Sequence, residues 1–421
     1  MQPMLEMVLG SRLTFSERLD PGKLARAVRL LLDLEPVLGC WFDERPFSAT
    51  WVRCDPDTPE PFAMIESDEP DVAAATFHST PFGRKAPRIA VLLVRSRDHD
   101  DLCVRFDHVA GDGWSAKEVT HLLAETYTRL LDDPGHTPAP RLAPRPTHTD
   151  VWGALTDEQR AAAANVPKMG FSKWSMKLAH ATGRTFAVRS LTLAPERIGA
   201  VREYAHARGA TVNEALVAAL VRSAASISPP AEGARPSVSV SADVRRFAAG
   251  AHLDRICNIA TTQTVLMDYR HGEAFDDTLR HVVDGVKPWR DSLWSIGGSL
   301  GHSATDPRPP KPVVLQTVFG LLAVMMRVGH SAALVTMNVG PLDEDRIAFG
   351  SARPLRAVLA GPIPRFSGFA TTISSYRDAV TLWMGFREDR MTPELIERCL
   401  AGIDAQLADA LRAAPEPREI D

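Results

Sequence analysis

The sequence of 421 residues lacks the features that mark several large classes of protein. Its five cysteines are scattered, and no C-x-x-C pair is present to hold zinc or carry out thiol exchange. A scattered, odd set of cysteines is typical of a reduced protein, and the amino-terminal residues contain no basic and apolar secretory signal. We therefore expect a cytoplasmic protein without a bound metal.

Long apolar runs and an excess of positive charge are also missing. The longest apolar stretch, residues 311–327, is interrupted by Pro312 and Gln316 and is shorter than the ~20 residues that span a bilayer. We expect a buried or interfacial helix there and no membrane association. With 48 Lys+Arg against 52 Asp+Glu, the net charge of -4 gives no general reason to bind nucleic acid.

The composition that is present, 45% hydrophobic and 24% charged residues, is that of a globular protein with an ample core. Five prolines between residues 134 and 146 indicate a linker or an extended crossing segment. We therefore expect an amino-terminal half at 1–145, a crossing segment at 146–180 and a carboxy-terminal half at 181–421. Each half mixes strand and helix patterns, which predicts an α/β (α+β) fold with a mixed sheet in each half.

Several patterns are specific enough to place individual elements. Ser115 and Glu118 fit a capping box for the helix that follows the H-x-x-x-D-G stretch, and Thr211 with Glu214 fits a second one. The remaining expected elements are helices at 21–34 and from Thr392 onward, and strands at 88–95, 101–108, 237–244 and on both sides of Arg377 and Asp378.

One stretch carries chemistry, namely an H-x-x-x-D-G pattern formed by His108, Asp112 and Gly113. A histidine at the end of a strand, followed by a glycine-containing turn and a helix start, can be held rigidly beside a substrate as a general base. A second copy, His302 to Asp306, is followed by Pro307 in place of glycine, so we discard it.

This stretch resembles the HHxxxDG motif of the condensation-domain and CoA-dependent acyltransferase superfamily. That superfamily includes chloramphenicol acetyltransferase, the condensation domains of nonribosomal peptide synthetases, polyketide-associated acyltransferases and wax ester synthases. The continuation DGWS resembles condensation domains in particular. Six further stretches resemble family elements in the expected order. They are LDPGKLARAVRLLLDLEPVLGCWF, PFGRKAPRIAVLLV, TVNEALVAALVRS, SADVRRFAAGAHLDRICNIAT, MNVGPLD and SSYRDAVTLWMGFRED.

The resemblance implies two chloramphenicol-acetyltransferase-like halves in a V, with a tunnel that admits donor and acceptor from opposite sides. It implies transfer of an acyl group from acyl-CoA or a phosphopantetheinyl carrier protein to a small-molecule hydroxyl or amine, in natural-product or lipid biosynthesis. No tightly bound cofactor is implied. His108 would be the general base, and Asp112 would pair with Arg245 to brace the loop.

Other residues near the motif have roles that the sequence leaves open. The backbone N–H of Gly113, at the helix start, is a candidate donor to the oxyanion. Trp114 either fixes the loop by packing or contacts substrate, and Asn338 either lines the channel or forms a turn. Asp107 replaces the first histidine of the family motif, and the DFGWG signature of plant acyltransferases has no counterpart.

Two other functions compete with acyl transfer. Asp107 gives weight to a catalytically inactive, condensation-like module that docks carrier proteins. Ser299 lies in a G-x-S-x-G pattern like that of serine hydrolases, but the mixed sequence before it and the prolines after it do not fit the strand and helix that flank a nucleophile elbow. We therefore expect acyl transfer and rank the hydrolase last.

Overall fold

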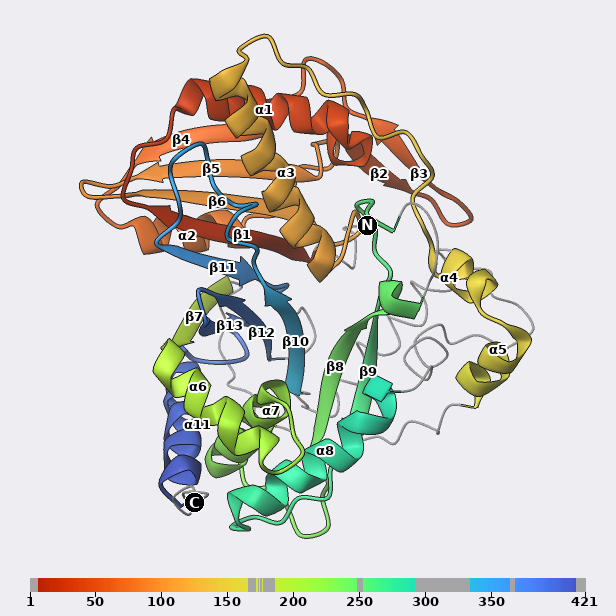
Figure 1. Cartoon of the computed structure of the whole chain (residues 1–421), viewed down its shortest axis with the longest axis vertical. Helices are drawn as coiled ribbons and strands as arrows, with labels where there is room; N and C mark the ends of the chain where they lie inside the picture. Colours follow the sequence, from red (N-terminus) through yellow and green to blue (C-terminus); the bar gives the residue numbers. More distant parts are fainter. Residues whose placement is uncertain are drawn as a thin grey trace, which may run out of the picture.

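The computed structural model describes residues 7–165, 172, 174, 176, 186–247, 253–291, 334–363 and 368–413. Most strands belong to two large mixed sheets, which occupy the upper and lower parts of Figure 1, and helices pack on both sheets. The predicted α/β class is therefore confirmed. Ser299 and residues 311–327 lie outside the described residues.

The first sheet holds five strands, and its central strand is buried at every residue. In spatial order the strands are β11 (Arg356–Ala360), β1 (Val8–Phe15), β6 (Asp100–Asp107), β5 (Ile89–Arg95) and β4 (Phe62–Glu66). Only β4 and β5 pair in parallel. The continuous apolar run expected as a strand is β5, and its two faces are covered by different helices.

Helices α1 (Pro21–Leu34) and α3 (Gly113–Asp132) pack on one face of this sheet, and α2 (Pro70–Ser79) packs on the other. Helix α1 begins where the sequence predicts, because the Asp20 carboxylate accepts a 3.0 Å bond from the backbone N–H of Lys23. A short 3-10 turn (Pro36–Gly39) then leads into the hairpin of β2 (Cys40–Glu44) and β3 (Ala49–Arg53).

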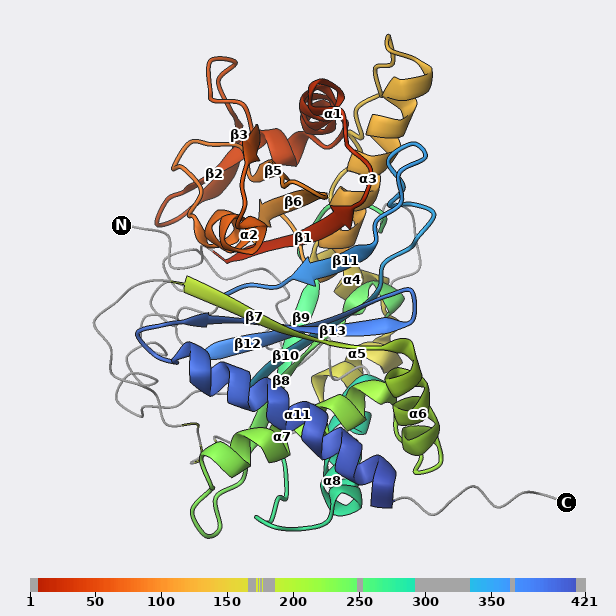
Figure 2. The same ribbon diagram turned by 90° about the vertical axis from the view of Figure 1, so that its left-hand side faces the viewer.

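The second sheet holds six strands, with helices on one face (Figure 2). In spatial order the strands are β7 (Phe186–Leu193), β13 (Ala379–Arg387), β12 (Phe369–Tyr376), β10 (Leu334–Pro341), β8 (Ser237–Asp243) and β9 (Ala260–Leu266). The covering helices are α6 (Pro195–His206), α7 (Val212–Ile227), α8 (Phe275–Asp291) and α11 (Pro393–Ala413).

The structure confirms two local predictions in this half. The capping box of Thr211 and Glu214 starts α7. Strands β12 and β13 are joined through Arg377 and Asp378, whose φ angles of 48° and 61° are left-handed. Such angles match the right-handed twist of a two-residue hairpin, so the turn forms although neither residue is glycine.

The two halves are interlocked at the first sheet. Strand β11 comes from the part of the chain assigned to the second half, yet it pairs with β1 in the first (Figure 2). Helices α4 (His148–Ala154) and α5 (Asp157–Ala164) follow the proline-rich segment at the side of the molecule (Figure 1). The boundary at residue 145 stays a prediction. The first sheet nevertheless includes β11, a strand that follows this boundary in the sequence.

The described part of the chain also bears on membrane and metal binding. It contains no helix that is both long and apolar enough to cross a bilayer. Within the same residues, His, Cys, Asp and Glu side chains form no group of three or more that could hold a metal ion.

Candidate active site

His108 lies directly after β6, where the chain turns before entering α3. Its backbone N–H donates to the carbonyl of Met7 at 2.8 Å, and its Nδ1 lies 2.9 Å from the carbonyl oxygen of Gly111. A side chain at position 111 would not fit, because a Cβ there would lie 2.5 Å from the Cβ of Ser115. Glycine therefore allows the tight turn that brings this carbonyl to the half-buried imidazole.

Asn258, which the sequence analysis did not single out, also holds His108. Its Nδ2 donates to the His108 backbone carbonyl at 2.9 Å and lies 3.2 Å from Nδ1 of the ring. A carbonyl oxygen only accepts, so the bond to Gly111 requires a proton on Nδ1. The amide nitrogen of Asn258 only donates and could bond Nδ1 only if Nδ1 carried a lone pair. We assign the tautomer from the shorter contact, 2.9 Å to the Gly111 carbonyl against 3.2 Å to the amide: Nδ1 carries the proton, and Nε2 carries the lone pair of a base.

Asp112, not Ser115, caps helix α3, and the predicted capping box is wrong. Oδ1 of Asp112 accepts bonds of 3.1 Å from both the backbone N–H and the hydroxyl of Ser115. Ser115 is therefore the third helical residue, and Glu118 lies too far along to reach back. Glu118 instead forms an ion pair with Arg346 at 2.9 Å.

Arg245 reaches Asp112 from the turn that follows β8. Its Nη1 donates to Oδ2 of Asp112 at 2.8 Å, and Nη2 donates to the Cys257 carbonyl at 3.0 Å. Burial alone would lower the pKa of Arg245, but the adjacent Asp112 carboxylate raises it above its ordinary value. Oδ2 of Asp112 also accepts the Ile259 N–H at 3.0 Å. One carboxylate thus joins the His108 loop to the segment that carries Asn258.

Trp114 packs over Arg245, with its ring centroid 4.5 Å from the guanidinium carbon. This contact places Trp114 in the support of the loop. Gly113 is the first residue of α3, so its backbone N–H has no partner within the helix. A Cβ at Gly113 would lie 3.0 Å from Cγ1 of Val339, so strand β10 closely approaches the helix start.

Asp107, in place of the family's first histidine, is engaged inside the protein. Its Oδ1 accepts the Val109 N–H at 3.0 Å, and its Oδ2 lies 3.4 Å from Nη1 of Arg88. Both side chains of the Arg88 pair are 7% exposed. Asp107 therefore stabilises the turn that carries His108, and Arg88 compensates its charge.

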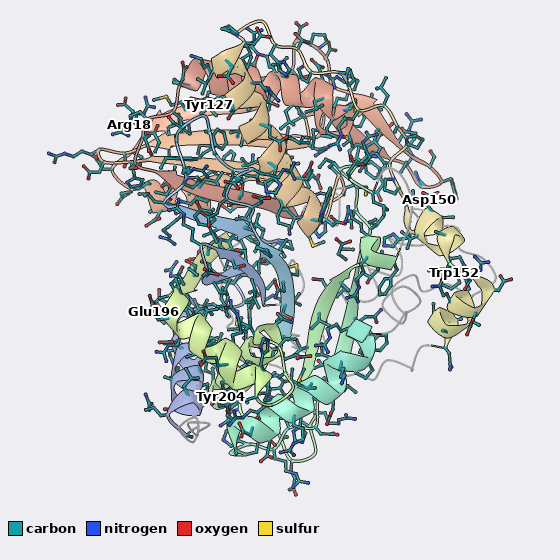
Figure 3. All side chains as sticks on the ribbon, viewed as in Figure 1. Arg18, Tyr127, Asp150, Trp152, Glu196 and Tyr204 are labelled. Carbon is teal, nitrogen blue, oxygen red and sulfur yellow. The ribbon has the colours of Figure 1, made fainter. Side chains whose placement is uncertain are left out.

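Helix α4 supports the same region from the crossing segment. Thr147 and Asp150 form a capping box at its start, and Trp152 on this helix is 8% exposed (Figure 3). Trp152 belongs to a small apolar cluster with Cys257 and Ile259, the neighbours of Asn258. The apolar residues on either side of Asn258 therefore anchor it, although its own side chain is exposed.

Among the described residues, Asn338 bonds neither His108 nor Asp112. Its Nδ2 donates to Oδ1 of Asn213 at 3.0 Å, and its Oδ1 accepts the Gly340 N–H at 2.9 Å. It lines a cavity of about 400 Å³ between α6, the start of α7 and the ends of β10 and β12, to which neither His108 nor Asp112 contributes. The structure thus joins His108, Asp112, Gly113, Trp114 and Arg245 in one cluster and places Asn338 in another.

Among known proteins, no family model and no curated protein sequence matches the chain. Solved structures do match. The first condensation domain of the CDA synthetase is 19% identical, with a TM-score of 0.66 over 96% of this chain and 92% of that one. Polyketide synthase associated protein 5 from Mycobacterium tuberculosis is 12% identical, with a TM-score of 0.68 over 97% and 95%.

Other similar structures are named for reactions other than condensation. They include the epimerization domain from the third module of tyrocidine synthetase B, which is 12% identical over 96% of this chain and 92% of that one, with a TM-score of 0.61. At these identities the likeness establishes the fold and leaves the reaction open. The chain has the condensation-domain fold, with its two chloramphenicol-acetyltransferase-like halves.

Proposed function

We propose that the protein is an acyltransferase that moves an acyl group from a thioester to a hydroxyl or amine, with His108 as general base. The observation that carries the proposal is the bond from Nδ1–H of His108 to the Gly111 carbonyl, which leaves Nε2 free to accept a proton. The donor would be acyl-CoA or an acyl carrier protein, and no tightly bound cofactor is required.

In this reaction Nε2 of His108 removes the proton from the acceptor as its oxygen or nitrogen attacks the thioester carbonyl. The negative charge that forms on the carbonyl oxygen needs a hydrogen-bond donor, and the N–H of Gly113 at the start of α3 is suited to that role. The C–S bond then breaks, and the protonated imidazole returns its proton to the leaving thiolate. A positioned base of this kind contributes roughly 10²- to 10⁴-fold to the rate.

The competing function is a docking module for carrier proteins that has no catalytic activity. Carrier proteins also fit as partners of this fold, since its structural neighbours include domains of nonribosomal peptide synthetases. The network around His108 favours catalysis, because docking alone gives no reason to fix the ring tautomer with Gly111 and to brace the loop with a buried ion pair.

A thiol-release assay tests the proposal. Acyl-CoA and acyl-carrier donors are combined with pooled alcohols and amines, and wild type is compared with His108→Ala and with His271→Ala, a control in an exposed turn. We expect acceptor-dependent release that His108→Ala loses and His271→Ala keeps. Equal activity of His108→Ala and wild type would rule out His108 as the base. Carrier binding without release by either protein would favour the docking module.

A further inference from the structure

Arg145 lies in the proline-rich segment that the sequence predicts to be a linker or an extended crossing segment. Its side chain turns inward and makes two hydrogen bonds to backbone carbonyls. Nε donates to the Ile256 carbonyl at 2.6 Å, and Nη2 donates to the Ala110 carbonyl. The guanidinium carbon lies 5.3 Å from the centroid of the Trp51 ring, which covers it from one side.

Both carbonyls belong to segments that contact the His108 ring. Ala110 lies within the loop between His108 and Asp112, next to the Gly111 carbonyl that receives the Nδ1 proton. Ile256 lies two residues before Asn258, whose Nδ2 bonds the His108 carbonyl. Arg145 is therefore bonded to both pieces of chain that fix the imidazole, although the two are more than 140 residues apart in the sequence.

Arg145 forms no ion pair with any residue that the structure describes. The neighbouring Arg141 and Arg255 instead share the buried Glu35, at 2.9 and 3.3 Å. Burial lowers the pKa of Arg145. The role of Arg145 therefore depends on the shape of its side chain. A planar guanidinium can hold two carbonyls in a fixed relation, whereas a lysine amine cannot.

We propose that Arg145 is a positioning residue of the active site: it fixes the His108 loop against the Asn258 segment and thereby keeps the imidazole in place. The inference rests on the proposed function for its effect on rate, but the effect on the His108 ring does not depend on any substrate. Displacement of a catalytic group by about 1 Å costs on the order of 10²-fold in rate, so loss of Arg145 should have a large effect on turnover.

The first experiment compares Arg145→Met with Arg141→Met. Arg141 lies in the same segment and bonds the Asp254 carbonyl at 3.1 Å, but it makes no bond to the His108 loop. Its loss also deprives buried Glu35 of one partner, so Arg141→Met should destabilise the fold at least as much. We expect Arg145→Met to lower kcat by roughly 10²-fold with little change in KM, and Arg141→Met to keep most of its turnover. Equal turnover of the two variants would overturn the proposal.

The second experiment observes the ring directly. Long-range ¹H–¹⁵N NMR spectra report which imidazole nitrogen carries the proton, and His108→Gln assigns the His108 signal. We expect wild type and Arg141→Met to show the Nδ1-H tautomer, and Arg145→Met to show a mixture of tautomers. An unchanged His108 signal in Arg145→Met would overturn the proposal. If wild type turns over no donor, the proposal of acyl transfer fails. A changed His108 signal in Arg145→Met would still support the positioning role of Arg145.

The lysine variants guard against misfolding of the methionine variants. Arg145→Lys keeps the charge and the length of the side chain but can hold only one of the two carbonyls well. We expect partial turnover, between wild type and Arg145→Met, and near-normal turnover for Arg141→Lys. Full turnover of Arg145→Lys would show that charge alone is sufficient and would overturn the role of the two-carbonyl geometry.

Discussion

Asp112 and Arg245 form a buried ion pair across the two halves of the molecule, with Oδ2 of Asp112 2.8 Å from Nη1 of Arg245. Their side chains are 1% and 8% exposed. The same carboxylate caps α3 through the N–H of Ser115. The ion pair and the start of α3 therefore both depend on the Asp112 carboxylate. The loop that carries His108 connects β6 to this helix start.

The first prediction is that Asp112→Ala loses both functions of this carboxylate. Removal of one partner of a buried pair leaves an uncompensated charge and costs about 3–5 kcal/mol of the free energy of unfolding. Urea unfolding followed by circular dichroism measures this loss. Asp243→Asn is the matched control, since Asp243 also pairs with Arg245, at 3.2 Å, but is 41% exposed and should contribute less than about 1 kcal/mol. Equal stabilities of the two variants would contradict the prediction.

The sequence predicted the parts of the fold and site that depend on local pattern. Helix α1 and the capping box of Thr211 follow from residues within one or two turns of each other. The strand before His108 follows from alternation of apolar residues, and the H-x-x-x-D-G pattern locates the loop. Each of these signals lies within a window that a local rule can evaluate.

The rest of the site depends on contacts between distant segments. Asn258 meets His108 across 150 residues, and no local rule assigns a role to one polar residue between apolar neighbours. In the sequence, Ser115 fits a capping box with Glu118. In the structure, the backbone N–H of Ser115 donates to the Asp112 carboxylate instead. Arg145 lies in a segment whose prolines predict its extended backbone and not the direction of its side chain.

The second prediction concerns Gly111, whose carbonyl accepts the Nδ1 proton of His108. A Cβ at this position would lie 2.5 Å from the Cβ of Ser115 and 3.0 Å from Cε2 of Phe106, so Gly111→Ala must displace the loop. We expect acyl transfer to fall by about 10²-fold while the protein stays folded. Gly153→Ala in α4, where a Cβ meets no atom within 4 Å, is the control and should stabilise the fold by roughly 0.5–1 kcal/mol. Normal turnover of Gly111→Ala would show that the carbonyl is dispensable.

The third prediction concerns Asn258, which donates to the backbone carbonyl of His108. Asn258→Ala removes this bond, while Asp112 and Arg145 still connect the loop to the segment that carried it. We expect the rate of acyl transfer to fall by roughly tenfold with little loss of stability, since the Asn258 side chain is exposed and a single hydrogen bond contributes about 1 kcal/mol. Asn338→Ala, in the separate cavity, should not change the His108 NMR signal. A larger change of that signal in Asn338→Ala than in Asn258→Ala would contradict this arrangement.

The fourth prediction concerns His78, an imidazole on α2 whose two ring nitrogens have no hydrogen-bond partner among the residues that the structure describes. Burial, reinforced by the nearby charges of Arg105 and Arg12, lowers the pKa of His78 from 6.5 to about 3. Between about pH 3 and pH 6.5, His78 therefore binds a proton in the unfolded chain but stays neutral in the folded chain. The contribution of His78 to stability is therefore complete above about pH 6.5 and is lost progressively as the pH falls toward 3, by up to ~1.4 kcal/mol per pH unit.

Urea unfolding of His78→Phe at several pH values between 4 and 8 tests this dependence. The slope of the free energy of unfolding against pH is compared, because any cost of fitting the larger ring shifts all points equally and does not change the slope. We expect His78→Phe to lose stability less steeply than wild type below pH 6.5, and exposed His271→Gln to keep the wild-type slope. Parallel curves for wild type and His78→Phe would show that His78 is already protonated in the folded protein or does not titrate between the two states. A flatter curve for His78→Phe alone would assign this part of the acid sensitivity to the buried ring of His78 on α2.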